Sequence, residues 1–153
     1  MNQHLALWPV ERIAYGIAPT SRRDVITALL DVATKGTRTT ADRKGRLLDV
    51  ILQREKSGST AAGGLAIPHG KSDEIRTPLA ALGVFPDGID FGSIDGGRVH
   101  AVFLLVSPLA RAAEHVDVLR SIAGIARHPD FMRFLRRTST AGEARGLLEE
   151  MGA

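Results

Sequence analysis

The chain has 153 residues, 44% of them hydrophobic and 24% charged, and 20 Lys and Arg against 17 Asp and Glu give a formal net charge of +3. Length and composition predict one compact domain, residues 1–153, whereas the small basic excess and 5% aromatic residues argue against nucleic-acid binding. The absence of cysteine excludes disulfides, thiolate metal sites and cysteine nucleophiles, so histidine is the leading candidate for covalent chemistry.

The first half of the chain predicts a strand and two helices. Residues 12–18 alternate weakly between apolar and polar side chains, which indicates a strand. Ser21-Arg22-Arg23-Asp24 then forms a capping box before apolar residues at helical spacing, which stop at Gly36. A second helix begins near Thr40 and ends near Lys56, where small and hydroxyl residues follow.

The second half predicts strands followed by helices. Residues 65–67, 79–85 and 99–106 have the apolar runs of strands, with turns predicted at Pro86-Asp87-Gly88 and Asp95-Gly96-Gly97. The last run is almost wholly apolar, which is typical of a central strand covered on both faces.

Three helices complete the chain, over residues 112–126, 131–136 and 140–148, the last one starting at a capping box. Strands interleaved with helices predict an α/β fold with helices on both faces of the sheet. The longest apolar runs are far shorter than the roughly 20 residues of a membrane helix, and the N-terminus lacks a signal pattern. We therefore expect a cytoplasmic protein without direct membrane insertion.

His69 is the first candidate for chemistry, because it follows a short strand-like segment and precedes a glycine. Ligands in α/β proteins bind outside the carboxyl ends of strands, where such a histidine would lie. Pro68 stiffens the exit from the strand, and we expect Gly70 to let the backbone approach whatever His69 holds. We interpret His69 as a phosphoryl acceptor, although a histidine on its own is more often a structural strand cap.

Other residues could surround such a phosphoryl group. His115 lies on the inward face at the start of a helix, where the helix N-terminus favours a neutral ring, although it could also be a structural histidine. Arg54 and the hydroxyl residues Ser59 and Thr60 offer positive charge and hydrogen bonds, or else form a solvated charge cluster and a linker. A metal site on His69 and His115 lacks a third ligand, so no metal is expected.

Three motifs occur in order: Arg54-Glu55-Lys56-x-Gly58-Ser59-Thr60, Ala66-Ile67-Pro68-His69-Gly70-Lys71 and Glu114-His115-Val116. With them, residues 13–148 resemble the fructose/mannitol-type enzyme IIA domain of the bacterial phosphotransferase system, and most closely its stand-alone nitrogen regulatory branch. The segment between Thr60 and His69 is one residue shorter than is usual there.

The resemblance implies a single mixed β-sheet with flanking helices and no cofactor. It also implies a phosphotransferase in which His69 accepts a phosphoryl group from the phosphohistidine of an HPr/NPr-type phosphocarrier. His115 then matches the assisting histidine and Arg54 the arginine that lines the site. Backbone N–H groups around Ser59 and Thr60 would stabilise the phosphoryl oxygens.

Three functions follow from this resemblance. The leading interpretation is a phosphoryl-accepting regulator that binds target proteins according to its phosphorylation state. The first alternative is a sugar-specific fructose/mannitol enzyme IIA that passes the phosphoryl group to a separate enzyme IIB. The second alternative is a regulatory binding module without phosphotransfer activity.

Overall fold

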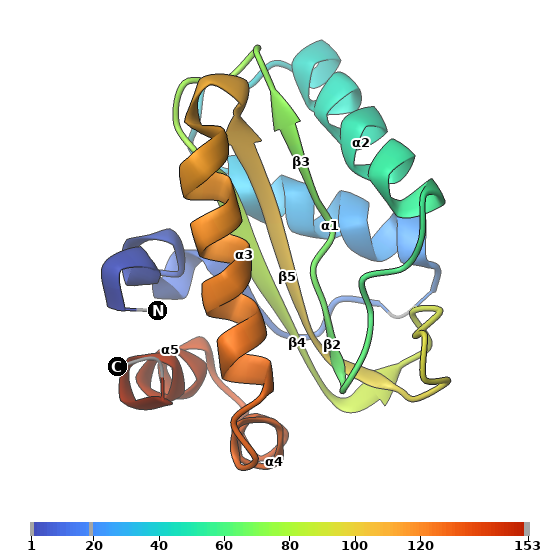
Figure 1. Ribbon diagram of the computed structural model, residues 1–153, viewed down its shortest axis with the longest axis vertical. Coiled ribbons are helices and arrows are strands. Elements are labelled where there is room, and N and C mark those ends of the chain that lie inside the picture. The colour runs from blue at the N-terminus through green and yellow to red at the C-terminus, as the bar shows by residue number, and fades with distance from the viewer. Residues whose placement is uncertain (1, 19, 152–153) are drawn as a thin grey trace.

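The computed structural model describes residues 2–18 and 20–151, which form helices around one five-stranded sheet (Figure 1). The strand order is β1 (Ile13–Ala14), β4 (Leu79–Ile89), β5 (Val99–Pro108), and then an outer position shared by β2 (Leu65–Ala66) and β3 (His69–Ser72). Strands β4 and β5 pair antiparallel, whereas the other pairs are parallel. The sheet is therefore mixed, as the resemblance implied.

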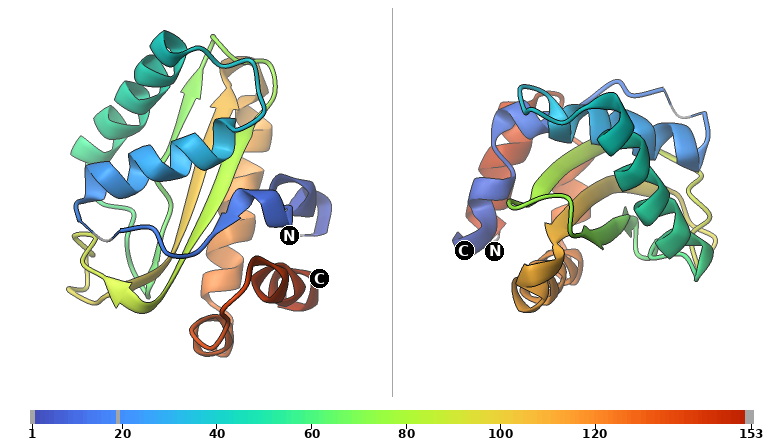
Figure 2. Two further views of the ribbon diagram at one scale, coloured as in Figure 1. Left: turned by 180° about the vertical axis from the view of Figure 1, so that it is seen from behind. Right: turned by 90° about the horizontal axis from the view of Figure 1, so that it is seen from above.

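Helices cover both faces of the sheet (Figure 2). One face carries α1 (Arg22–Thr34) and α2 (Ala41–Lys56), and the other carries α3 (Ala112–Ala126), α4 (Phe131–Leu135) and α5 (Ala141–Met151). This layering confirms the predicted α/β class. Within residues 2–18 and 20–151, no helix has both the length and the apolar character needed to cross a membrane.

The capping box predicted at α5 forms in full, because the Thr140 N–H also donates to Glu143. At α1 the predicted Ser21 cap forms, but the Asp24 carboxylate accepts from the Thr20 hydroxyl. The Ser21 hydroxyl accepts a hydrogen bond from the Asp24 N–H at 3.0 Å, and the Thr140 hydroxyl accepts one from the Glu143 N–H at 3.2 Å. Each bond satisfies a donor that the first turn of a helix leaves unpaired. Local sequence therefore decides where these two helices begin.

Strand β5 is the centre of the core, because all 10 of its residues are buried. Its side chains alternate between the two helical layers: Leu104 packs with α1 and α2, whereas Phe103 packs with α3 to α5. The Phe103 ring also meets the buried Trp8 ring edge-on, with the centroids 5.1 Å apart. The expected central strand covered on both faces is confirmed.

Two sequence-based predictions about strands were wrong. The strand predicted over residues 12–18 is reduced to β1, because the chain leaves the extended conformation at Gly16, where φ is +76°. The turn predicted at Pro86-Asp87-Gly88 lies inside β4, as a bulge in which residues 85–88 face the single residue His100. A bulge tolerates proline because it does not require every N–H to pair.

The pairing around His69 also differs in part from expectation. Strands β2 and β3 keep the same register against β5, with Leu65 opposite Ala101 and His69 opposite Leu105. They are thus two parts of one line of pairing, interrupted where Pro68 cannot donate a hydrogen bond. His69 follows the carboxyl end of β2, as predicted, but it is also the first residue of β3, so the line of pairing continues beyond it.

Candidate functional site

His69 faces α3, whereas the next residue, Gly70, faces α2, as the alternation of a strand requires. A Cβ atom on Gly70 would lie only 2.6 Å from Cγ1 of Val50 in α2. Gly70 is therefore needed for the close approach of α2 to β3. The missing Cβ makes room for Val50 on the α2 side, and the expected approach of the Gly70 backbone to a ligand of His69 stays a prediction.

The His69 ring is held in one tautomer. Its Nδ1 lies 2.5 Å from the carbonyl oxygen of Ile67, and a carbonyl can only accept, so Nδ1 carries the hydrogen. Burial lowers the pKa of His69 below its ordinary value, with the charges of Arg54 and Lys71 acting in the same direction and the Ile67 carbonyl opposing them. The ring is therefore neutral at neutral pH, with its lone pair on Nε2.

His115 is the second imidazole at this place. Its side chain is buried, as the sequence predicted, and its ring centroid lies 5.5 Å from that of His69 with the two planes at 47°. Burial, and then the charges of His69 and Lys71, lower the pKa of His115 to about 4. Burial, rather than the helix N-terminus that the sequence suggested, is thus the main reason why this ring is neutral.

The hydroxyl of Ser107 in β5 lies 2.7 Å from Nδ1 of His115. Sequence reasoning did not single out Ser107, although it is the first hydroxyl residue after the apolar run 99–106. Its place beside His115 depends on α3 folding back along β5, which local sequence does not reveal.

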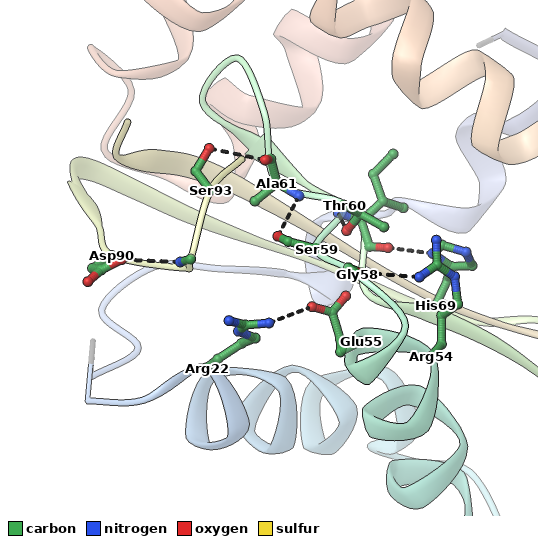
Figure 3. Close-up of polar contacts among 12 residues, drawn as sticks. Arg22, Arg54, Glu55, Gly58, Ser59, Thr60, Ala61, His69, Asp90 and Ser93 are labelled. Carbon is green, nitrogen blue, oxygen red and sulfur yellow. Dashed lines mark hydrogen bonds and ion pairs between the residues drawn. The ribbon is translucent and has the colours of Figure 1, made fainter. Parts of the chain in front are cut away.

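Arg54 lies in the last turn of α2, and Figure 3 draws it beside His69. Its Nη1 donates to the carbonyl oxygen of Gly58 at 3.2 Å, and its charge contributes to the lowered pKa of His69. The guanidinium is thus fixed at the start of the loop that leads toward His69. The structure brings together Arg54, His69 and His115.

Ser59 and Thr60 shape the backbone of this loop. The Thr60 hydroxyl accepts a hydrogen bond from the N–H of Ile67 at 3.0 Å, and the Ser59 hydroxyl accepts one from the N–H of Ala61 at 3.0 Å. Thr60 therefore holds Ile67, whose carbonyl in turn holds His69 (Figure 3). A direct role of either hydroxyl in phosphate binding stays a prediction.

The short connection between Thr60 and His69 closes in a tight turn. Ala62 and Leu65 exchange both backbone hydrogen bonds, at 2.9 and 3.2 Å, around Gly63 and Gly64. Both glycines have positive φ, 63° and 83°, as a two-residue hairpin turn requires. Asp95 accepts a further hydrogen bond from the N–H of Gly63 at 2.9 Å, so the approach to His69 is well anchored.

A partly buried ion pair lies at the end of α2 that carries Arg54. Glu55 Oε2 lies 3.3 Å from Nη1 of Arg22 in α1, and only 4% of the Glu55 side chain is exposed (Figure 3). Burial raises the pKa of Glu55 above its ordinary value, and the charge of Arg22 opposes this shift. The pair links α1 to the last turn of α2.

A family profile described as phosphoenolpyruvate-dependent sugar phosphotransferase system, EIIA 2, matches residues 7–151. A nitrogen regulatory protein of Bradyrhizobium diazoefficiens is 38% identical over 115 residues, which cover 74% of this chain and 75% of that protein. A fructose-specific EIIA component of Haloferax volcanii is 28% identical over 144 residues, which cover 94% of this chain and 92% of that protein.

Solved structures share the fold. The nitrogen regulatory protein IIA-Ntr of Neisseria meningitidis aligns with a TM-score of 0.82 and 23% identity over 95% of this chain and 99% of that one. The mannitol IIA of Escherichia coli, in its complex with phosphorylated enzyme IIB, aligns with a TM-score of 0.74 and 20% identity. The alignment covers 93% of this chain and 96% of that one. With the profile match and the relatives in sequence, the resemblance is confirmed: the chain belongs to the EIIA 2 family, the phosphoryl-transfer components of the phosphoenolpyruvate-dependent sugar phosphotransferase system.

Proposed function

We propose that Nε2 of His69 accepts a phosphoryl group from the phosphohistidine of an HPr/NPr-type phosphocarrier in the cytoplasm. The observation that carries this proposal is the hydrogen bond from Nδ1 to the Ile67 carbonyl, which leaves the lone pair of a neutral ring on Nε2. Nε2 forms the new P–N bond as the carrier's P–N bond breaks, and the electron pair returns to the carrier's imidazole. Because one P–N bond replaces another, the transfer is readily reversible.

His115 and Arg54 stabilise the phosphoryl oxygens in this proposal. If the Ser107 hydroxyl donates to Nδ1 of His115, the neutral ring carries its hydrogen on Nε2 and can donate it to an oxygen of the transferring group. Arg54 supplies positive charge, and the loop at Ser59 and Thr60 offers backbone N–H groups. His115 thus assists while His69 forms the covalent bond.

We further propose that the phosphorylation state serves nitrogen-related regulation through target proteins. The relative that supports this is the nitrogen regulatory protein of Bradyrhizobium diazoefficiens. The fructose-specific component of Haloferax volcanii supports a second candidate, in which the phosphoryl group passes to a separate enzyme IIB. The two differ in the acceptor of the phosphoryl group.

Labelling with phosphoenolpyruvate tests the first step. The chain is incubated with labelled phosphoenolpyruvate, enzyme I and the phosphocarrier, and we expect an acid-labile, base-stable phosphate on the wild type and none on His69→Ala. Circular dichroism serves as the control for folding. An unlabelled wild type, or equal labelling of His69→Ala, would overturn the proposal and leave a binding module without phosphotransfer.

A second assay separates the two candidate functions. The labelled protein is mixed with enzyme IIB of the fructose type, and loss of label to IIB supports the sugar-specific function. Retention of the label, together with target proteins captured in only one phosphorylation state, supports regulation.

A further inference from the structure

A second polar pocket lies at the end of the sheet opposite the His69 site. It has a volume of about 650 Å³ and lies between the bulge in β4, the start of β5 and α4. In Figure 1, α4 lies at one end of the sheet and β3 at the other. His100 of this pocket stands five positions along β5 from Leu105, the partner of His69, which is about 17 Å of strand.

One acidic residue, Asp87, and four arginines line this pocket. The arginines are Arg98, Arg133, Arg136 and Arg137. Arginine guanidiniums are planar and bind phosphate through two parallel hydrogen bonds, which lysine cannot do. Arg133 is already paired with Asp130, whose Oδ1 lies 2.7 Å from its Nη2, so four arginines against two aspartates leave a local positive excess of two. Positive charge is therefore concentrated at a place that the proposed phosphoryl transfer does not use.

Two of these guanidiniums are fixed by the bulge in β4. Arg98 donates from Nε to the carbonyl of Asp87 at 3.1 Å and from Nη2 to that of Gly88 at 2.7 Å. Arg136 donates from Nε to the carbonyl of Pro86 at 3.4 Å. These bonds leave Nη1 of Arg98 and both Nη atoms of Arg136 for a ligand. Less side-chain entropy is lost on binding when the donors are already fixed.

The other walls of the pocket are less charged. His100 donates from Nδ1 to the carbonyl of Phe85 at 3.0 Å, so in the uncharged tautomer that this bond selects Nε2 is the acceptor nitrogen. A Cβ atom on Gly64 would lie 3.3 Å from Cγ of Met132, so the Met132 side chain packs closely over the turn. An acceptor nitrogen and an apolar wall suit a ligand that carries an organic group as well as charge.

We propose that this pocket binds a small soluble organic diphosphate. A diphosphate ester carries about three negative charges at neutral pH, because the second pKa of its terminal phosphate is near 6. Arg98, Arg136 and Arg137 together offer donors to more than one phosphate group, whereas Arg133 is already paired with Asp130. The diphosphate meets the guanidiniums, and the organic group lies against Met132 and Pro86. Because the pocket and His69 are at opposite ends of the sheet, this ligand and the phosphocarrier can bind together.

Calorimetric titration with pyrophosphate and with ADP tests the proposal on the unphosphorylated protein, at about 0.15 M salt so that weak surface attraction is screened. We expect saturable binding at one site, tighter for ADP. The double variant Arg136→Ala/Arg137→Ala should weaken binding about tenfold or more. Arg120→Ala is the matched control, because that arginine lies on α3 outside the pocket with 78% of its side chain exposed, and should bind as the wild type does.

Four outcomes would overturn the proposal: no saturable binding to the wild type, equal weakening by Arg120→Ala, loss of binding in His69→Ala, or displacement of ADP by a short single-stranded DNA at lower phosphate concentration. Loss in His69→Ala would place the anion at the phosphoryl site, and displacement by DNA would indicate a polyanion surface. The titration contains no phosphocarrier, so its failure leaves the proposed phosphoryl transfer untouched. The double variant should still be labelled on His69.

Discussion

His69 and His100 lie at opposite ends of the sheet and are held in the same way. Each donates from Nδ1 to a backbone carbonyl, that of Ile67 or that of Phe85, so in each ring Nε2 is the nitrogen that this bond leaves free. Their surroundings differ: a second neutral imidazole lies 5.5 Å from His69, whereas four arginines line the pocket of His100. A fixed tautomer therefore does not define a phosphoryl acceptor, and the groups around Nε2 decide what each histidine can do.

Each histidine also depends on a glycine. A Cβ atom on Gly70 would lie 2.6 Å from Val50 Cγ1, and one on Gly88 would lie 2.7 Å from Cε1 of His100. The first contact would lie between β3 and α2, on the side away from the His69 ring. The second would be with the His100 ring itself. The two ends can therefore be disturbed one at a time.

The largest effect should come from removing each imidazole in turn. His69→Ala should lose the acid-labile label, because no other side chain would hold the phosphoryl group. His100→Ala should still be labelled, after correction for any loss of folded protein measured by thermal unfolding. Labelling that depends equally on both histidines would contradict the distinction between the two ends.

The next effect should come from the neighbours of His69. His115→Ala should slow phosphoryl transfer about 100-fold, the usual effect of losing one donor to a developing charge. Ser107→Ala should slow it about fivefold, because it removes one hydrogen bond worth about 1 kcal/mol that positions the His115 ring. Rapid-quench kinetics measure both rates. Equal rates in His115→Ala and wild type, in both directions of transfer, would remove His115 from the site.

The sequence predicted the parts of the molecule whose signals are local. Ser21 and Thr140 cap helices through bonds to residues three positions away, and these bonds form as expected. The resemblance joined His69, His115 and Arg54 before any geometry was known, and the structure places them together. Their roles in catalysis stay predictions.

The parts that were missed depend on pairing between distant segments. His69 begins β3 because β2 and β3 share one register with β5, and nothing near residue 69 encodes that register. Pro86 and Gly88 favour a turn or a bulge equally, and pairing with β5 decides for the bulge. Ser107 reaches His115 only after α3 packs along the sheet.

A smaller effect should follow from filling the space at the two glycines. Gly70→Ala should lower the free energy of unfolding by about 2 kcal/mol, because its Cβ overpacks against Val50, and Val50→Ala should restore most of the loss. Gly45→Ala is the control in α2: its Cβ meets open space, so it should stabilise by about 0.5–1 kcal/mol. Urea unfolding measures all of them.

Gly88→Ala extends this comparison to the other end. It should weaken ADP binding through its contact with His100 and leave the labelling of His69 as it is. Loss of labelling in Gly88→Ala, at full folding, would show that the two ends are coupled.

A further effect, similar in size to that of Gly70→Ala, should be a loss of stability in acid to which the His69 end contributes through His115. Folded His115 stays neutral down to a pKa of about 4, whereas the unfolded chain takes up that proton near the ordinary value of 6.5. The unfolded state therefore binds more protons between these values, and the free energy of unfolding should fall by about 2 kcal/mol as the pH drops from 6.5 toward 4. His69 adds to the fall in the same direction, because its pKa is also lowered.

His115→Gln should reduce the slope of the free energy of unfolding against pH, measured by urea unfolding at a series of pH values. An unchanged slope would show that acid acts elsewhere. Guanidinium groups keep their charge over this range, so diphosphate binding at the other end should instead weaken as the terminal phosphate of the ligand is protonated near pH 6.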